Sequence, residues 1–297
     1  MGWLDVLLRG RKAATPGPAT SSAEPLDPAQ MMADALSAAQ VGDYETALFL
    51  WEKLARGGLP RAQNNIGACF AEGLGVERDP ALAFRWLHLS AENADPVGQR
   101  NLAALYFKGE GAPQDYLRAA ELYRAAADQG DASAQDMLSW MLLEGEIVPF
   151  DAAAARRYAL LAADQGIASS MTRLGMLHHN ALGVERDPSE AARWWQRAAE
   201  RGDADGQAML GAAVHLGSGV PRDPLAAYEW LLRGYNGGSG LATPFMDAVR
   251  AALSEEQQAE AERRAALPLP GLPLPELPLP EQPSPESPPT TVAEAAS

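Results

Sequence analysis

The sequence feature that most constrains the fold is an unbroken internal repeat. Its first copy occupies residues 62–95, and each later copy begins 36 residues after the one before it. The copies start, without a gap, at Ala62, Gly98, Ala134, Ser170 and Gly206. A fixed period of this length is typical of a solenoid, in which each unit buries its hydrophobic face against its neighbours. We therefore expect the 297 residues to form one extended array with short tails, rather than two globular domains.

Each repeat reads as two helices joined by a glycine-containing turn. A large aliphatic residue followed by a small residue recurs on the first helix, at Ile66, Leu102, Leu138, Leu174 and Leu210. An alanine recurs on the second helix, followed three residues later by a large residue, at Trp86, Leu122, Tyr158, Trp194 and Trp230. This spacing predicts a buried stripe on each helix. The third repeat has Ile147 where the others have the second glycine of the turn, so we expect a different turn there.

A column of aspartates precedes the second helix, at Asp79, Asp115, Asp151, Asp187 and Asp223. Aspartate at a helix start accepts hydrogen bonds from free backbone N–H groups, and proline, which follows three of these residues, suits the first helical position. Their recurrence in every repeat favours capping over catalysis.

No other pattern indicates an active site, a metal or a cofactor. The histidines, His88, His178, His179 and His215, lack a set of cysteine or carboxylate ligands at recognisable spacing. The single cysteine, Cys69, lies in a core column, and neither a nucleophile elbow nor a phosphate-binding loop is present. We therefore predict a protein that is not an enzyme, has no catalytic residue and binds no metal or cofactor. The net charge of −15 argues against nucleic acid as a partner.

The segments outside the repeats divide into four. Residues 1–28 are predicted to be disordered, with an amphipathic hook in residues 1–12 that either docks on a membrane or a partner, or is a frayed tail. Residues 29–59 form an atypical helical hairpin that caps the array, and residues 60–240 hold the five repeats. Residues 241–266 read as capping helices, in which Ser254 and Gln257 form a capping box. Residues 267–297 are a proline-rich disordered tail that either docks on an aromatic groove of a partner or serves only solubility.

The shared columns give the pattern A-x-x-x-L-G-x-x-Y-x-x-G-x-G-V-x-x-D-x-x-x-A-x-x-W-x-x-x-A-A-x-x-G, which resembles the Sel-one-like repeat. This family is related to the tetratricopeptide repeats, and the resemblance covers residues 62–238. It implies an all-α fold, a right-handed α-solenoid of stacked antiparallel helix hairpins that serves as a scaffold for other proteins. Cysteine-rich members have been credited with β-lactam binding or hydrolysis. The corresponding cysteines are absent here, which disfavours that enzymatic branch.

The resemblance also implies that the first helices line the concave face. On that assumption, two columns and one further residue are our candidate partner-binding residues. They are Asn64, Arg100, Asp136 and Thr172, then Trp140 and Met176, and His179. Trp140 stands out because its column is otherwise small or flexible, although it could also be packed locally. The alternatives are therefore a binding anchor and a core residue.

We expect a non-enzymatic scaffold or adaptor that binds a segment of another protein on the concave face. The alternative is a peripheral membrane-associated regulator recruited by residues 1–12, and a β-lactam-type enzyme is a distant third. The sequence contains no run of about 18 apolar residues, so we predict no membrane span. We expect a monomer in the cytoplasm, with contact at the inner face of the membrane if the hook is used.

Overall fold

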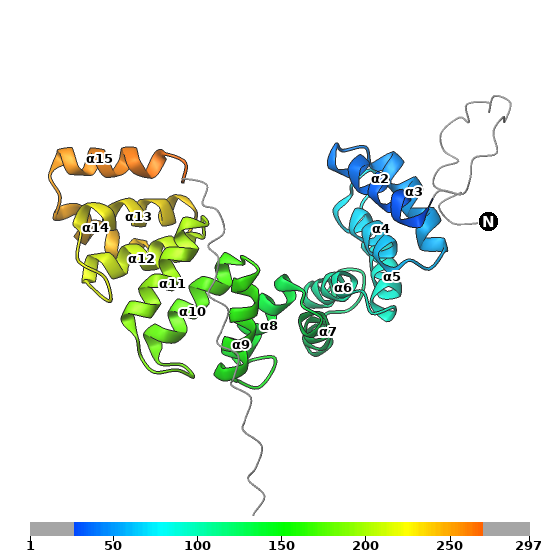
Figure 1. Cartoon of the computed structure of the whole chain (residues 1–297), viewed down its shortest axis with the longest axis horizontal. Coiled ribbons are helices and arrows are strands. Elements are labelled where there is room, and N and C mark those ends of the chain that lie inside the picture. Colours follow the sequence, from blue (N-terminus) through cyan, green and yellow to red (C-terminus); the bar gives the residue numbers. More distant parts are fainter. Residues whose placement is uncertain (1–26, 270–297) are drawn as a thin grey trace, which may run out of the picture.

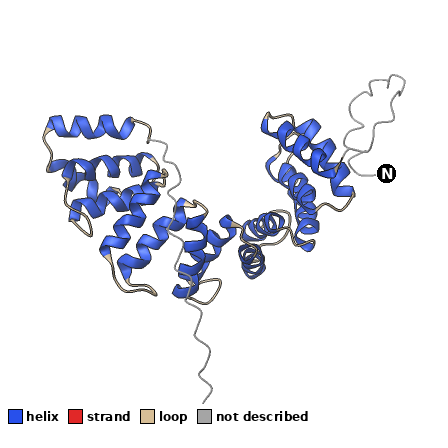
Figure 2. Ribbon diagram, viewed as in Figure 1, coloured by secondary structure: helices blue, strands red, loops and turns tan. Residues whose placement is uncertain are grey.

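The computed structural model describes residues 27–269, so the predicted hook and the proline-rich tail beyond residue 269 lie outside the described residues. Within this range all regular structure is helical, in fourteen helices (Figure 2). They are α2 (Pro28–Gln40), α3 (Tyr44–Arg56), α4 (Pro60–Glu72), α5 (Pro80–Glu92), α6 (Pro96–Lys108), α7 (Tyr116–Asp128), α8 (Ala132–Glu144), α9 (Ala152–Asp164), α10 (Ala168–Asn180), α11 (Pro188–Glu200), α12 (Ala204–Leu216), α13 (Pro224–Asn236), α14 (Thr243–Ala251) and α15 (Glu255–Ala266). The predicted all-α solenoid is confirmed.

The helices are stacked in chain order along an arch, with α2 to α5 in one arm and α12 to α15 in the other (Figure 1). From α2 to α14 each helix packs on the next, and α15 packs on α13. The first helices of neighbouring repeats also contact one another, as in α4 with α6 and α10 with α12, whereas no pair of second helices in residues 27–269 packs as closely. The first helices therefore line the inner side of the curve. No described helix is both long and apolar enough to span a bilayer.

The recurring aspartates cap the second helices, as predicted. Asp79 Oδ1 accepts a hydrogen bond of 2.9 Å from the backbone N–H of Leu82, and the corresponding aspartates accept equivalent bonds in the other four repeats. Asp95, Asp131 and Asp203 cap first helices in the same way. Since each carboxylate is engaged by the backbone, this column is part of the architecture of the repeat.

The small residue of the first helix provides room for the second helix of the same repeat. A Cβ atom added to Gly67 would lie 2.7 Å from Cγ of Leu87, and one added to Gly175 would lie 2.3 Å from Nε1 of Trp195. These distances are shorter than any van der Waals contact, so only glycine permits this approach. The alanine column, which includes Ala83, is fully buried beside it. The hydrophobic core therefore runs between the two layers of helices.

The turn of the third repeat differs from the others, as its sequence predicts. The second glycine of the turn has a positive φ in the other four repeats, for example +70° at Gly75, and Ile147 has none. Three residues further on, the other repeats have Arg78, Gln114, Arg186 or Arg222, and each donates a hydrogen bond to a carbonyl in the last turn of the first helix. Phe150 occupies this position and has no donor, so its ring is left exposed.

Helices α14 and α15 cover the end of the last repeat. The capping box of Ser254 and Gln257 is present, as predicted. Arg233 of α13 donates hydrogen bonds to the carbonyls of Arg264, at 2.5 Å, and Leu267, at 2.9 Å. These two bonds fix the point at which the chain leaves α15.

Candidate protein-binding face

The four residues predicted to form an outward column lie at the fifth position of successive first helices. Asn64 is only 3% exposed and Thr172 only 5%, so for these two residues the predicted outward orientation is wrong. Arg100 and Asp136 are partly buried. The physical reason is that the next repeat lies directly over this column and takes up its polar groups.

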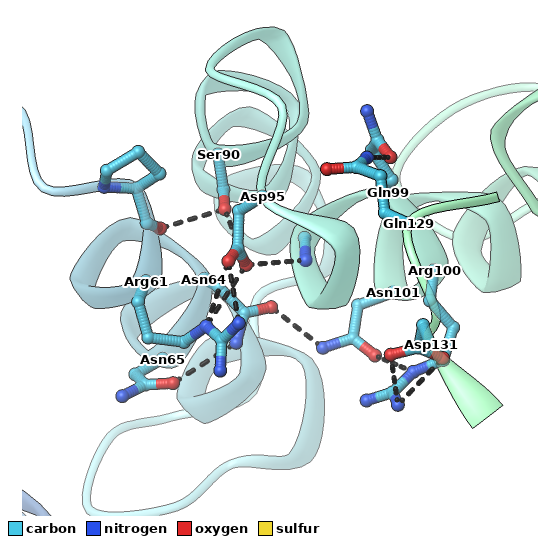
Figure 3. Close-up of polar contacts among 12 residues, drawn as sticks. Arg61, Asn64, Asn65, Ser90, Asp95, Gln99, Arg100, Asn101, Gln129 and Asp131 are labelled. Carbon is cyan, nitrogen blue, oxygen red and sulfur yellow. Dashed lines mark hydrogen bonds and ion pairs between the residues drawn. The ribbon is translucent and has the colours of Figure 1, made fainter. Parts of the chain in front are cut away.

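In the first half of the array this polar contact runs from α4 through α6 to the start of α8 (Figure 3). The side-chain amide of Asn101 donates a hydrogen bond of 2.8 Å to Oδ1 of Asn64. Arg100 donates to the capping carboxylate of Asp131 at 3.1 Å. Arg61 donates at 2.8 Å to Asp95, which caps the following first helix. Each bond therefore joins one repeat to the next.

The second half of the array uses different residues for the same purpose. Asp136 accepts hydrogen bonds from Ser169 at 3.0 Å, Ser170 at 2.5 Å and Arg173 at 2.6 Å, all on the next first helix. The hydroxyl of Thr172 donates at 2.6 Å to Asp203, the next capping residue. The predicted column therefore forms hydrogen bonds between successive repeats, and of its four residues only Arg100 and Asp136 keep some exposed surface.

Glutamines in the neighbouring column form hydrogen bonds within a repeat, each to a glutamine that follows the second helix of the same repeat. Gln129 donates to Gln99 at 2.8 Å, and Gln165 donates to Gln135 at 2.9 Å. Their sequence signal is a glutamine at the fourth position of the first helix in four repeats, Gln63, Gln99, Gln135 and Gln207. The sequence analysis did not identify this column.

Trp140 lies on the inner side of α8, at the ninth position of its helix, and belongs to a line of aromatic side chains. Its ring centroid is 6.1 Å from that of Phe107, which is 5.1 Å from the ring of Tyr116. We call Tyr116, Phe107 and Trp140 the aromatic strip. Trp140 and Phe107 are partly buried against the core, whereas Tyr116 is 43% exposed. Met176, at the position equivalent to Trp140 on the next first helix, is 41% exposed.

The aromatic strip has no counterpart in the first repeat. Ala71 stands where the second repeat has Phe107, and Pro80 stands where it has Tyr116. Trp140 and Met176 were predicted as binding residues from the sequence, whereas Phe107 and Tyr116 were not. The signal for the missed pair was a Phe or Tyr at positions where the other repeats have alanine, leucine, histidine or proline.

The histidines of the first helices point to different neighbours. The ring of His179 lies 5.4 Å from that of Trp195, in the same repeat, and the ring of His215 lies 6.4 Å from that of Phe245. His179 is therefore packed against its own hairpin rather than brought together with Trp140. Among the residues that the structure describes, no three histidine, cysteine, aspartate or glutamate side chains are grouped as a metal site would require.

The chain matches the family model described as Sel1 repeat in six segments, residues 38–59, 60–95, 96–131, 132–167, 168–203 and 204–239. The first of these segments lies in the hairpin predicted as an atypical cap. A comparison with curated proteins gives no significant match.

Two solved structures are similar to the chain. A Sel1 repeat protein from Oxalobacter formigenes is 26% identical, with a TM-score of 0.68 over 79% of this chain and 98% of that one. The protective antigen c5321 from uropathogenic Escherichia coli, which displays an SLR fold, is 27% identical, with a TM-score of 0.47 over 80% of this chain and 61% of that one.

Proposed function

The chain belongs to the Sel1 repeat family, whose solenoids commonly serve as scaffolds for protein interaction, and we propose that it binds a segment of another protein on its inner face. The observation that supports this proposal is the aromatic strip. Trp140 and Tyr116 bring large side chains to the inner face and its edge, and Met176 adds a flexible apolar side chain. Aromatic residues are enriched in binding surfaces because they supply contact area at a low cost in conformational entropy, and methionine because its flexible side chain adapts to the shape of a partner.

The hydrogen bonds between repeats separate residues that hold the array together from residues that are free to contact a partner. Asn64 and Thr172 hold the repeats together from buried positions, so they define the curvature of the face rather than its contact chemistry. In our proposal Trp140 and Met176 make the contacts, and Arg100 and Asp136 contribute at the rim of the contact area. His179 stabilises the wall of the face from behind, through its contact with Trp195.

In this proposal the protein acts as a cytoplasmic monomer. The sequence has a single cysteine, the buried Cys69, so no intramolecular disulfide can form, as is usual for proteins of a reducing compartment. Sedimentation of the full chain at several concentrations measures the oligomeric state. A dimer that buries the aromatic strip would contradict the monomer.

Site-specific photo-crosslinking in cells tests the binding face. A benzoylphenylalanine replaces Met176 on the inner face or, as a matched control, Leu161 on the second helix α9, which is 43% exposed and close to Met176 in exposure. We expect a crosslink to one defined protein from position 176 and not from position 161. Equal products from both positions, or none from position 176, would refute the inner face as the binding site.

A further inference from the structure

The turn between α8 and α9 carries an exposed apolar patch. Phe150 in this turn is 56% exposed, and Tyr116 and Leu117, which begin the preceding second helix α7, are 43% and 66% exposed. We call Tyr116, Leu117 and Phe150 the loop-edge patch. At the position of Phe150 the other repeats have Arg78, Gln114, Arg186 and Arg222, and at that of Leu117 they have Ala81, Ala153, Ser189 and Leu225.

The register of the array brings the members of the loop-edge patch together. In the other repeats the second glycine of the turn lies against the first residue of the preceding second helix. A Cβ atom added to Gly75, for example, would lie 2.4 Å from Cβ of Tyr44. The same approach occurs between Gly111 and Pro80, Gly183 and Ala152, and Gly219 and Pro188. In the third repeat Ile147 holds the glycine position and Tyr116 the helix start. The turn that carries Phe150 therefore lies beside α7.

A helix of the same chain covers the equivalent position in the last repeat. Leu225, the second residue of α13, corresponds to Leu117 and is partly buried. It shares a pocket with Glu256, Glu260 and Arg263 of α15, which packs on α13. No helix between residues 27 and 269 covers Leu117 in this way. A helix satisfies its own backbone hydrogen bonds, whereas an extended segment would find no strand to pair with in the described part of the chain.

The surroundings of the loop-edge patch are negatively charged. Residues 108–121 and 144–151 contain six acidic and two basic residues. One of the basic residues, Arg118, is already paired with Glu121 at 2.7 Å. Glu144 and Glu146 are exposed on either side of Gly145, and neither forms an ion pair with a residue between 27 and 269. A segment with lysine or arginine beside its apolar side chains is therefore attracted here, whereas an anionic membrane surface is repelled.

We infer that the partner presents an amphipathic helix to the loop-edge patch, with lysine or arginine beside its apolar face. The inference rests on the proposed function and names the kind of segment that the partner uses. Tyr116 belongs to both the aromatic strip and the loop-edge patch, so one contact area can extend from Trp140 on the inner face to Leu117 and Phe150 at its edge.

Titration of the full chain with labelled model peptides tests the chemistry of the loop-edge patch. The probe is a peptide of about 14 residues, or four helical turns, with leucine at helical spacing and lysine elsewhere. One control peptide has the same composition without helical spacing, and the other has glutamate in place of lysine. Fluorescence anisotropy measures the dissociation constants. We expect the lysine peptide to bind and both controls to bind at least about ten-fold more weakly.

Variants that borrow residues from another repeat locate the contact. Leu117→Ser with Phe150→Arg introduces the residues of the fourth repeat, Ser189 and Arg186, so the helix content and the melting temperature should be unchanged. We expect this double variant to raise the dissociation constant of the lysine peptide about ten-fold or more, because both apolar contacts are lost. Leu89→Ser on α5, at a position that is 43% exposed outside the loop-edge patch, is the matched control and should leave it unchanged.

Two further measurements test the charge and the natural partner. Glu144→Gln with Glu146→Gln should raise the dissociation constant of the lysine peptide about three-fold. In cells, a benzoylphenylalanine at position 117 should crosslink to the same protein as one at position 176. Mass spectrometry of the product should identify a segment with apolar residues at helical spacing and lysine or arginine beside them.

Several results would overturn the inference. They are no binding of the lysine peptide, equal binding of the control peptides, or unchanged binding to the double variant. A crosslink from position 117 to a second copy of this chain, or to a segment without helical spacing, would assign the loop-edge patch to that occupant instead. If the inference fails in one of these ways and position 176 still crosslinks to one defined protein, the proposed function stands. If the lysine peptide binds as expected and position 176 gives no crosslink, the inner face fails and the loop-edge patch stands.

Discussion

At the scale of single residues, Asp136 joins its repeat to three side chains of the next first helix. It accepts from Ser169, Ser170 and Arg173, and the side chain of Arg173 is only 14% exposed. Asp136→Ala leaves that guanidinium partly buried without its counter-ion. Since hydrogen bonds to charged groups contribute about 1.5–3 kcal/mol, we expect a loss of about 2–3 kcal/mol in the free energy of unfolding, measured by urea denaturation.

The matched control is a surface ion pair of the same chain. Arg118 and Glu121 lie three residues apart on α7 and are both more than half exposed. Glu121→Ala should change the free energy of unfolding by less than about 0.5 kcal/mol. If both substitutions lowered the free energy of unfolding equally, Asp136 would not stabilise the contact between repeats.

The column of capping aspartates was predicted correctly from the sequence, and the column of Asn64 and Thr172 was not, for a physical reason. The capping of Leu82 by Asp79 spans three residues, so local sequence was enough to predict it. The bond from Asn101 to Asn64 spans 37 residues, and it forms only because neighbouring repeats are offset along the superhelix. A column in the sequence shows that positions are equivalent, but it does not show which neighbour covers them. Asn64 and Thr172 were misplaced for this reason.

At the scale of elements, the two turns of each repeat use a left-handed residue that is usually glycine. Ala181 ends α10 at φ +57°, where the other first helices end at glycines such as Gly73, at φ +76°. A left-handed conformation costs an alanine roughly 1 kcal/mol, partly offset by the entropy that glycine loses on folding. Ala181→Gly should therefore raise the free energy of unfolding by about 0.5–1 kcal/mol, measured by thermal unfolding.

The control for this substitution is the same change in a right-handed segment. Ala153 is exposed in the first turn of α9, where glycine should be neutral or should lower the stability by up to about 1 kcal/mol. Stabilisation at position 153, or destabilisation at position 181, would show that backbone conformation is not what limits the stability of α10.

At the scale of the whole molecule, the sequence predicts one continuous array, but the apolar core is divided. One cluster runs from Ala35 to Tyr158, a second from Ala159 to Ala198, and a third from Ala191 to Ala261. The first division lies within α9, between Tyr158 and Ala159, and close to it the residues that face each other from α9 and α10 are exchanged. Two repeats earlier the equivalent positions are Phe84 and Tyr106, whose rings meet edge to face at 5.3 Å.

At the divided junction these positions are held by Arg156 and His178. Both have a buried nitrogen, Nε and Nδ1 respectively, without a hydrogen-bond partner among residues 27–269. The period of the repeat was readable in the sequence, and His178 was visible there as a departure in a core column. The unpaired nitrogens of Arg156 and His178 were not readable there, because they depend on which groups of other helices surround each side chain.

An aromatic pair like Phe84 and Tyr106, placed at positions 156 and 178, should therefore join the first two clusters of the core. In a solenoid, stability is a sum of repeat and interface terms, so a weak interface lets the halves unfold separately. The double substitution Arg156→Phe with His178→Tyr removes two unsatisfied buried groups and adds an edge-to-face contact. We expect about 1–3 kcal/mol of added stability and a steeper urea transition, with each single substitution giving less than half of the effect.

Hydrogen exchange gives the direct measurement. Amides of α9 and α10 should exchange before those of α4 to α7 in the native chain and together with them in the double variant. Exchange of α9 and α10 that is already as slow as that of α4 to α7 would contradict a weak junction.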